Sequence, residues 1–259
     1  MFNSFRRFGR LGVLTALLLV VIFATAVYAN HSWGTYHWAR KSNPFNLKLG
    51  DNMSAAWDSY LAIASTDWSA SSVLATTVVA GQTSPKRCNP VNGRVEVCNS
   101  KYGNNGWLGL AQIWVSGNHI TKGAVKLNDF YFNMPTYNTS AWRQFVVCQE
   151  IGHTFGLDHQ DENFDNPNFG TCMDYTRDPS TNQHPNAHDY EQLEAIYAHL
   201  DSVTTIGQSL PNGNKADVNL DEPTEWGKAV RQSQDGRNSL YERDLGHGNK
   251  VFTFVIWAN

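Results

Sequence analysis

The sequence is poor in charged residues, which make up 17% of its 259 positions, whereas soluble proteins average about 25%. It has no run of more than two basic residues, and the formal net charge is −3. A surface without a basic patch offers little to the phosphates of nucleic acids or to an anionic lipid surface. The composition therefore argues against nucleic-acid binding. Hydrophobic residues, at 41%, suffice for a sizeable core.

The sequence also lacks an internal repeat and any pair of cysteines in C-x₂-C spacing. Without that spacing, metal binding by the four cysteines is disfavoured. An even number of cysteines in an exported chain indicates two disulfides, for which three pairings are possible. We favour Cys88–Cys98, which closes a short loop rich in Pro, Asn and Gly, together with Cys148–Cys172, whose members lie beside the motif residues described below.

The first 29 residues have the pattern of a secretory signal peptide. Three arginines precede an apolar stretch over residues 11–27, and Val27 and Ala29 are small residues at the positions favoured for cleavage. An uncleaved membrane anchor is the alternative, because the stretch has about the minimum length for a span. We expect cleavage after Ala29 and a secreted, extracellular protein. The rest of the chain then has a net charge of −6, since the segment carries three positive charges and no negative one.

Apolar residues recur with two periods along the exported chain. Alternation over residues 45–49 predicts a half-buried strand, and the helical spacing of Trp, Leu and Ala over residues 54–69 predicts an amphipathic helix. The element order indicates an α+β domain over residues 30–201, in which two long helices back a twisted sheet. Residues 202–259 are predicted to be a linker and a small β appendage. The other predicted elements are strands over residues 73–80, 107–115, 120–128 and 250–257, and helices over residues 141–155 and 188–200.

The informative segment is residues 148–159, which read Cys-Gln-Glu-Ile-Gly-His-Thr-Phe-Gly-Leu-Asp-His. Gln149 and Glu150 precede His153 by four and three positions, so all three side chains share one helix face. Gly156 permits a bend with positive φ, after which His159 can return to the same spot. Such a convergence supplies metal ligands and leaves a position open for water. The pattern E-x-x-H-x-x-G-x-x-H arises by chance in roughly one chain per thousand of this size.

This segment, together with Met173-Asp174-Tyr175, resembles the metzincin signature H-E-x-x-H-x-x-G-x-x-H and its Met-turn. The similarity covers roughly residues 45–200 and is closest to matrixin-like and other small secreted members. It implies a metzincin-like fold, a twisted mixed sheet in which the active-site helix is followed by a Met-turn. Residues 30–201 would be the catalytic domain, and Trp107–Ala111 the edge strand that binds the substrate backbone.

The resemblance also implies a role for each matching residue. His153 and His159 would bind Zn²⁺ through neutral imidazole nitrogens, and Glu150 would be the general base that takes a proton from water. Met173 would form a hydrophobic floor under the metal. Tyr175 stands where some metzincins place a tyrosine that binds zinc or assists the transition state, and a packed core tyrosine is the alternative.

The sequence departs from the family at Gln149, where the signature has its first histidine. An amide oxygen is a weaker zinc ligand than an imidazole, but its reach and helix position are right. We therefore expect Gln149 to face the metal with its side-chain oxygen. Alternatively another group completes the set. His184 and His188 follow the Met-turn but are typical of surface or cap residues, and His119 falls in a predicted turn.

These features predict a secreted zinc metallopeptidase that hydrolyses peptide bonds in a protein or peptide substrate through a metal-activated water. The alternatives are a catalytically dead metzincin-like binding module and a related hydrolase that acts on a non-protein amide. We expect no nucleic-acid partner and, after signal cleavage, no membrane partner. Ca²⁺ is a possible second ion in the acidic loop, although the loop lacks an EF-hand pattern and an ordinary solvated loop is the alternative. The loop's carboxylates are Asp158, Asp161, Glu162 and Asp165.

Overall fold

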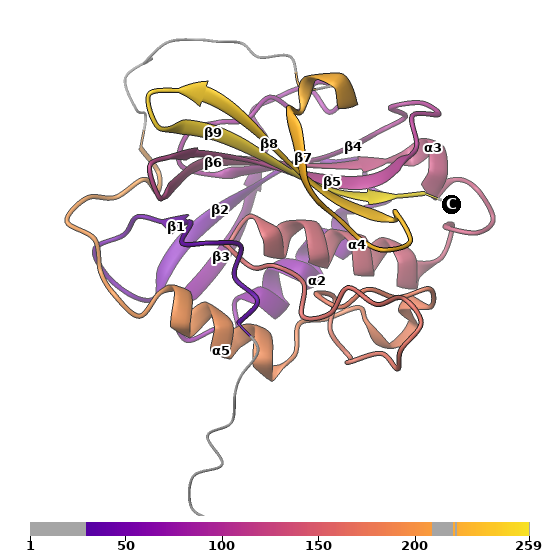
Figure 1. Ribbon diagram of the computed structural model, residues 1–259, viewed down its shortest axis with the longest axis horizontal. Coiled ribbons are helices and arrows are strands. Elements are labelled where there is room, and N and C mark those ends of the chain that lie inside the picture. Colours follow the sequence, from indigo (N-terminus) through magenta and orange to yellow (C-terminus); the bar gives the residue numbers. More distant parts are fainter. Residues whose placement is uncertain (1–29, 209–219, 221, 259) are drawn as a thin grey trace, which may run out of the picture. The chain divides into compact units, whose positions relative to one another are not determined.

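The structure is a computed structural model that describes residues 30–208, 220 and 222–258 (Figure 1). The predicted signal peptide, residues 1–29, lies outside the described residues, as does half of the predicted linker. The described residues from His31 onward form one compact unit. A large sheet with a few helices confirms the predicted α+β class. Among the described residues, no helix combines the length and apolar character needed to cross a lipid bilayer.

Within the described residues, the centre of the molecule is a nine-stranded mixed sheet. Its strands follow the order β3-β2-β4-β6-β5-β9-β8-β7, and β1 pairs with β6 beside this path. The strands β2, β3, β4 and β6 are parallel, whereas β5 and the C-terminal strands pair antiparallel. The strands are β1 (His37–Trp38), β2 (Phe45–Asn52), β3 (Leu74–Ala80), β4 (Val95–Ser100), β5 (Trp107–Ser116), β6 (His119–Asn128), β7 (Lys228–Gln232), β8 (Asn238–Gly246) and β9 (Asn249–Trp257).

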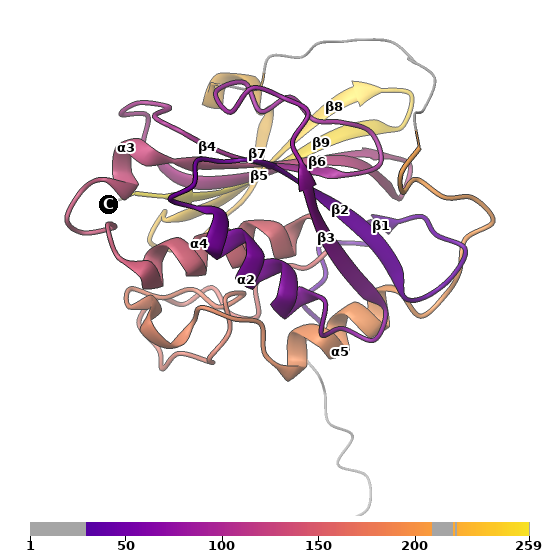
Figure 2. The same ribbon diagram turned by 180° about the vertical axis from the view of Figure 1, so that it is seen from behind.

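Helices α2 (Asp58–Trp68), α4 (Ser140–His153) and α5 (Ala187–Ile196) all cover the same face of the sheet, as the two opposite views show (Figures 1 and 2). The main hydrophobic core lies between these helices and the sheet. Both ends of each of these three helices lie within four residues of the predicted positions. The short helices are α3 (Asp129–Phe132), η1 (Pro179–Thr181) and η2 (Pro223–Glu225).

Strand β4 lies in the segment that the sequence indicates to be loop-rich, residues 81–106. The alternation of apolar and polar residues does not predict this strand, because Glu96, in mid-strand, is fully buried and forms an ion pair with Arg94. Both predicted disulfides are confirmed. Cys88–Cys98 ties this strand to the preceding loop, and Cys148–Cys172 ties α4 to the chain after it.

The C-terminal tail, here residues 222–258, continues the sheet of the preceding residues. The predicted strand over residues 250–257 is present as β9, and β7 and β8 extend the sheet beyond it. Residues of β9 alternate between two cores: Phe252, Phe254 and Ile256 pack beneath the helices, while Val251 and Val255 pack on the other face. A strand that is apolar on both faces needs a place inside a sheet.

The expectation that Trp107–Ala111 forms an edge strand is therefore wrong. Strand β5 pairs with β6 on one side and with β9 on the other, from Trp107 to Ser116. The physical reason is that β9 is apolar on both faces. It therefore lies inside the sheet, between β5 and β8, with a hydrophobic core on each face. The edge of β5 that was expected to bind a substrate backbone is occupied by the tail.

Candidate metal centre

Helix α4 carries three of the predicted site residues, Gln149, Glu150 and His153. The Thr139 hydroxyl accepts a hydrogen bond from the Trp142 backbone N–H and so caps the first turn. Every residue in the second half of the helix is buried. The three polar side chains therefore lie inside the protein, where each needs a partner for its polar atoms.

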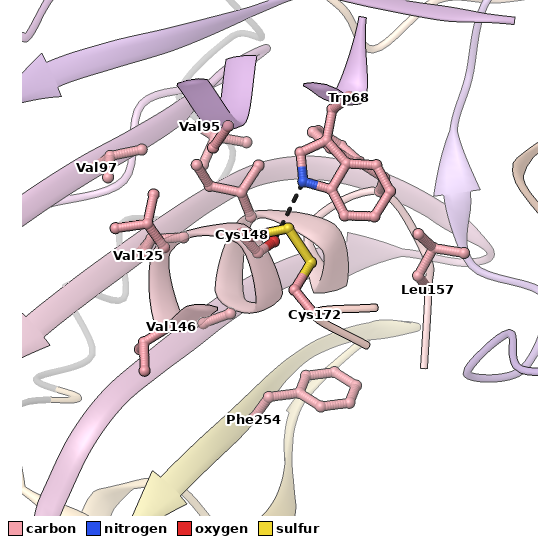
Figure 3. Close-up of a cluster of buried hydrophobic side chains, with 14 of the residues drawn as sticks. Trp68, Val95, Val97, Val125, Val146, Cys148, Leu157, Cys172 and Phe254 are labelled. Atoms are coloured by element: carbon pink, nitrogen blue, oxygen red, sulfur yellow. Dashed lines mark hydrogen bonds between the residues drawn. A yellow bond between two sulfur atoms is a disulfide. The ribbon is translucent and has the colours of Figure 1, made fainter. Parts of the chain in front are cut away.

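The Cys148–Cys172 disulfide holds α4 against the segment that contains Met173, within a cluster of apolar side chains (Figure 3). The indole N–H of Trp68 donates to the Cys148 carbonyl at 3.2 Å, which fixes the middle of the helix. Met173 packs on Gly152, where an added Cβ would lie only 2.6 Å from the sulfur. A side chain at this position would push the Met173 segment away from the helix.

A bend at Gly156 returns the chain to the helix end. Its φ is +99°, and an added Cβ would lie 2.6 Å from the Tyr36 carbonyl oxygen, so glycine satisfies two constraints. After the bend, the ring of His159 lies against that of His153, with centroids 4.5 Å apart and planes at 81°. The structure thus brings the two predicted histidines together.

Hydrogen bonds select the nitrogen that each histidine presents. The Nδ1–H of His153 donates to the Leu157 carbonyl at 2.9 Å, because a carbonyl only accepts, and Nε2 keeps its lone pair. The Nδ1 of His159 lies 3.4 Å from an Asp158 carboxylate oxygen. Burial lowers the pKa of both histidines below the usual range. Both rings are therefore neutral at pH 7, the form in which imidazole binds a metal.

Gln149 is oriented by its amide nitrogen, which donates to the Cys172 carbonyl at 2.9 Å and leaves Oε1 on the other side of the amide. In the described part of the chain, Gln149 Oε1, Glu150 Oε2 and His159 Nε2 are buried atoms without a hydrogen-bond partner. An unpartnered buried polar atom costs roughly 1–3 kcal/mol. An amide oxygen and two imidazoles are ligands that suit Zn²⁺, so the residues present fit such an ion.

Glu150 and Tyr175 border the same region. Burial raises the pKa of Glu150 well above its ordinary value, so the carboxyl holds a proton unless a cation lies nearby. The Tyr175 ring lies 4.1 Å from that of His159, between centroids, and also packs on Phe164. Burial raises the pKa of Tyr175 as well, which keeps its hydroxyl protonated. Tyr175 is thus both a buried aromatic residue and a direct neighbour of His159.

Two residues of the tail reach this region, and no local sequence pattern marks either of them. Phe254, on β9, stacks on His153 with ring centroids 4.0 Å apart and planes at 13°. Arg231, on β7, forms a two-pronged ion pair with Asp158, one arm of which measures 2.6 Å. The tail also supplies most of the lining of the small cavity beside His159, namely Arg231, Ser233, Asn238, Ser239, Leu240 and Phe254.

The carboxylates considered for Ca²⁺ have protein partners. Arg231 pairs with Asp158 and, at 3.0 Å, with Glu162. Asp165 pairs with Arg177 at 2.7 Å. Burial alone would raise the pKa of Asp158, but hydrogen bonds from His159 and Arg231 lower it far below the usual range. Asp158 and Glu162 converge beside His159, where the Arg231 guanidinium lies between the tail and the loop, whereas Asp165 pairs elsewhere.

The other histidines considered as ligands have neighbours of their own. His184 is exposed and lies 2.7 Å from an Asp67 carboxylate oxygen. The His188 ring packs on that of His31, with centroids 4.7 Å apart, in the first turn of α5. His119 begins β6, where its Nε2 lies 3.2 Å from Asp201.

No protein family profile and no curated protein matches the sequence. Among solved structures, the chain is similar to high choriolytic enzyme 1, a hatching enzyme zinc-protease from Oryzias latipes (medaka fish), and to myroilysin. The first match has 9% identity and a TM-score of 0.37 and covers 64% of this chain and 96% of that one. The second has 13% identity and a TM-score of 0.35 and covers 65% and 89%. Because the identities and TM-scores are low, the site is interpreted from the residues of this chain alone.

Proposed function

We propose that the protein is a zinc-dependent endopeptidase whose metal ligands are Gln149, His153 and His159. The observations that carry the proposal are the buried, unpartnered Gln149 Oε1 and His159 Nε2, together with the Nε2 lone pair of His153, whose Nδ1 binds the Leu157 carbonyl. The Gln149 amide is oriented by its Nε2–H, which donates to the Cys172 carbonyl, and the two imidazoles are neutral. A cation bound to all three atoms would satisfy them together.

Glu150 is the group that moves a proton in this proposal. In its ionised form its carboxylate accepts a proton from the attacking water and passes it to the leaving amine. Its buried position removes competing solvent, and Tyr175, kept protonated by burial, is a hydrogen-bond donor beside His159. The chemistry supplied by Zn²⁺ in such a site is Lewis acidity, which acidifies water and polarises a carbonyl.

The proposed enzyme is latent in the described conformation. An extended peptide binds to a sheet by pairing with a free strand edge, but β9 occupies that edge of β5. In addition, Phe254 covers one face of His153. A protein substrate therefore gains access only after the tail moves.

The second candidate is a binding module of the same fold without catalysis. Two observations favour it: the weaker ligand at Gln149 and the closure of the site by the tail. Secretion of the protein is part of the proposal for both candidates. A protein or peptide substrate belongs to the peptidase candidate.

Metal analysis and cleavage of an unfolded protein substrate separate the candidates. The full chain and its Phe254→Ala variant are compared, with Phe252→Ala as the matched control, because Phe252 shares the same face of β9 but packs on Trp33 and Tyr36. The proposal predicts bound zinc in all three and chelator-sensitive cleavage that is strongest in Phe254→Ala. Absence of both metal and cleavage favours the binding module. Zinc without proteolysis favours hydrolysis of a non-protein amide.

A further inference from the structure

A second cluster of imidazoles lies outside the candidate metal centre. It comprises His37 on β1, His119 at the start of β6, and His199 and Asp201 in the segment after α5. Strand β1 pairs with β6 so that His37 and His119 lie opposite each other. Three parts of the chain that are distant in sequence therefore present histidines to one carboxylate. None of these residues takes part in the candidate metal centre.

The distances in this cluster are those of ligands around a single ion. The Asp201 Oδ1 atom lies 3.3 Å from the Nε2 of His37, 3.2 Å from that of His119 and 3.7 Å from that of His199. The Nε2 atoms of His37 and His199 are 3.1 Å apart. In a tetrahedral zinc site with bonds of about 2.0–2.1 Å, two ligand atoms are separated by about 3.3 Å.

The hydrogen bond behind His37 decides which nitrogen the neutral ring presents to the cluster. Its Nδ1 lies 2.8 Å from the Thr35 carbonyl, which only accepts, so the proton of the neutral ring is on Nδ1. The Nε2 lone pair then faces the Asp201 carboxylate at 3.3 Å, and two acceptors at this distance repel each other. A backbone carbonyl behind the ring is also the usual outer-shell partner of a metal-binding histidine.

Arg40 holds the carboxylate in place from the opposite side. Its backbone N–H and its Nη1 donate to Asp201 Oδ2, at 3.1 and 3.0 Å, which leaves Oδ1 turned toward the histidines. The Arg40 guanidinium also donates to the backbone carbonyls of Tyr197 and His199. The segment that carries His199 and Asp201 is therefore fixed by a buried side chain before any ion binds.

We propose that His37, His199 and Asp201, whose ligand atoms all lie within 4.8 Å of one another, form a second zinc site, with His119 beside Asp201 at its rim. Imidazole nitrogens and one carboxylate oxygen are a ligand set that suits Zn²⁺. The His119 and His199 side chains are 33% and 53% exposed, so an ion reaches the site from solvent. The bound ion ties β1 and the end of the α5 region to the sheet. The Trp38 indole, next to His37, donates to the Thr154 carbonyl at the end of α4.

The test counts zinc in the full-length chain. A His159→Ala background disables the candidate metal centre, so zinc that remains belongs to the second site. We expect the His159→Ala protein to retain one equivalent after dialysis and the His159→Ala/His199→Ala protein to retain none. Added Zn²⁺ should raise the thermal unfolding temperature of the first protein and leave that of the second unchanged.

His184→Ala in the same background is the matched control. His184 is as exposed as His199, at 57%, and also contacts an aspartate, but it has no second histidine beside it. It should retain its equivalent of zinc. Equal zinc content in the His199→Ala and His184→Ala proteins overturns the proposal. The zinc content of these variants does not depend on the proposed peptidase function, because the measurement involves no cleavage of a substrate.

Discussion

Gln149 is the residue on which the metal affinity of the candidate centre depends most. The Cys172 carbonyl already orients its amide, so a histidine there replaces a preset oxygen with a stronger nitrogen ligand. We expect Gln149→His to tighten zinc binding by an order of magnitude or more and Gln149→Ala to weaken it as much. Competition with a chromophoric chelator measures both. Gln144→Ala is the control, since Gln144 is another buried amide of α4. Equal affinities in the two alanine variants would place Gln149 away from the metal.

Glu150 is the residue on which proton transfer depends. We expect Glu150→Gln to lower hydrolysis by about 10²–10⁴-fold, the usual cost of losing a general base, while zinc content stays the same. The change keeps the size of the side chain and removes its ability to accept the proton. Initial rates and metal analysis of the same samples, in the Phe254→Ala background, give the answer. Near-normal turnover would show that another group is the base.

At the scale of elements, the Cys148–Cys172 disulfide joins α4 to the segment whose carbonyl orients Gln149. Replacing both cysteines with alanine should lower the free energy of unfolding by about 3 kcal/mol and also weaken zinc binding. Replacing Cys88 and Cys98 in the same way should lower stability without changing zinc affinity, since that disulfide lies by β4. Denaturant unfolding and chelator competition report the two effects. A loss of zinc affinity in both double variants would contradict the assignment.

The packing of α5 on α2 should be sensitive to alkaline pH. Burial, with Asp67 and Asp189 nearby, raises the pKa of Tyr190 to about 12 from its ordinary 10.0, and its hydroxyl donates to the Asp67 carbonyl. Above pH 10 the unfolded chain releases this proton first, so the stability due to Tyr190 falls as the pH rises toward 12. Tyr190→Phe should be less stable than the native sequence at pH 8, with the difference shrinking by pH 11. A constant difference in unfolding free energy at the two pH values would refute this.

Apolar spacing in the sequence predicts those elements in which one face is buried and apolar. The helical spacing in α2, α4 and α5 reflects one buried face each, so their existence could be predicted from the sequence. Strand β4 could not, because its buried Glu96 depends on Arg94 and on Asn52 of the neighbouring strand. The position of β9 beside β5 was missed because strand order is set by contacts between segments more than a hundred residues apart.

At the scale of the molecule, the tail is fastened by Arg231, which pairs with Asp158 and Glu162 beside His159. We expect Arg231→Gln to loosen the tail and raise chelator-sensitive cleavage severalfold, because it leaves both carboxylates without their cation. Arg243→Gln is the matched control, since the ion pair of Arg243 with Glu225 lies within the tail. Rates of cleavage of an unfolded protein, at equal zinc content, test the comparison. Equal rates in the two variants would mean that the Arg231 pair does not hold the site closed.

Some residues of the candidate site could be predicted from the sequence, and others could not. The positions of Gln149, His153 and His159 on one helix and one bend follow from spacing alone, and the structure brings the two histidines together. The roles of Phe254 and Arg231 depend on where the tail strands join the sheet, which no local spacing records. For the same reason His119, which the sequence placed in a turn without a pattern, was not connected with His37, His199 and Asp201.

The position of β9 between β5 and β8 has a consequence for the order in which the protein is made. Synthesis proceeds from the N-terminus, so α4 and both histidines of the candidate centre exist before Phe254 does. Until β9 arrives, β5 has an open hydrogen-bonding edge, which is prone to pair with other chains. During the same period His153 is uncovered and a metal ion can reach it. If the proposed metal centre holds, we expect metal to bind before the site closes, and we expect the nascent chain to need protection at that edge until β9 is in place.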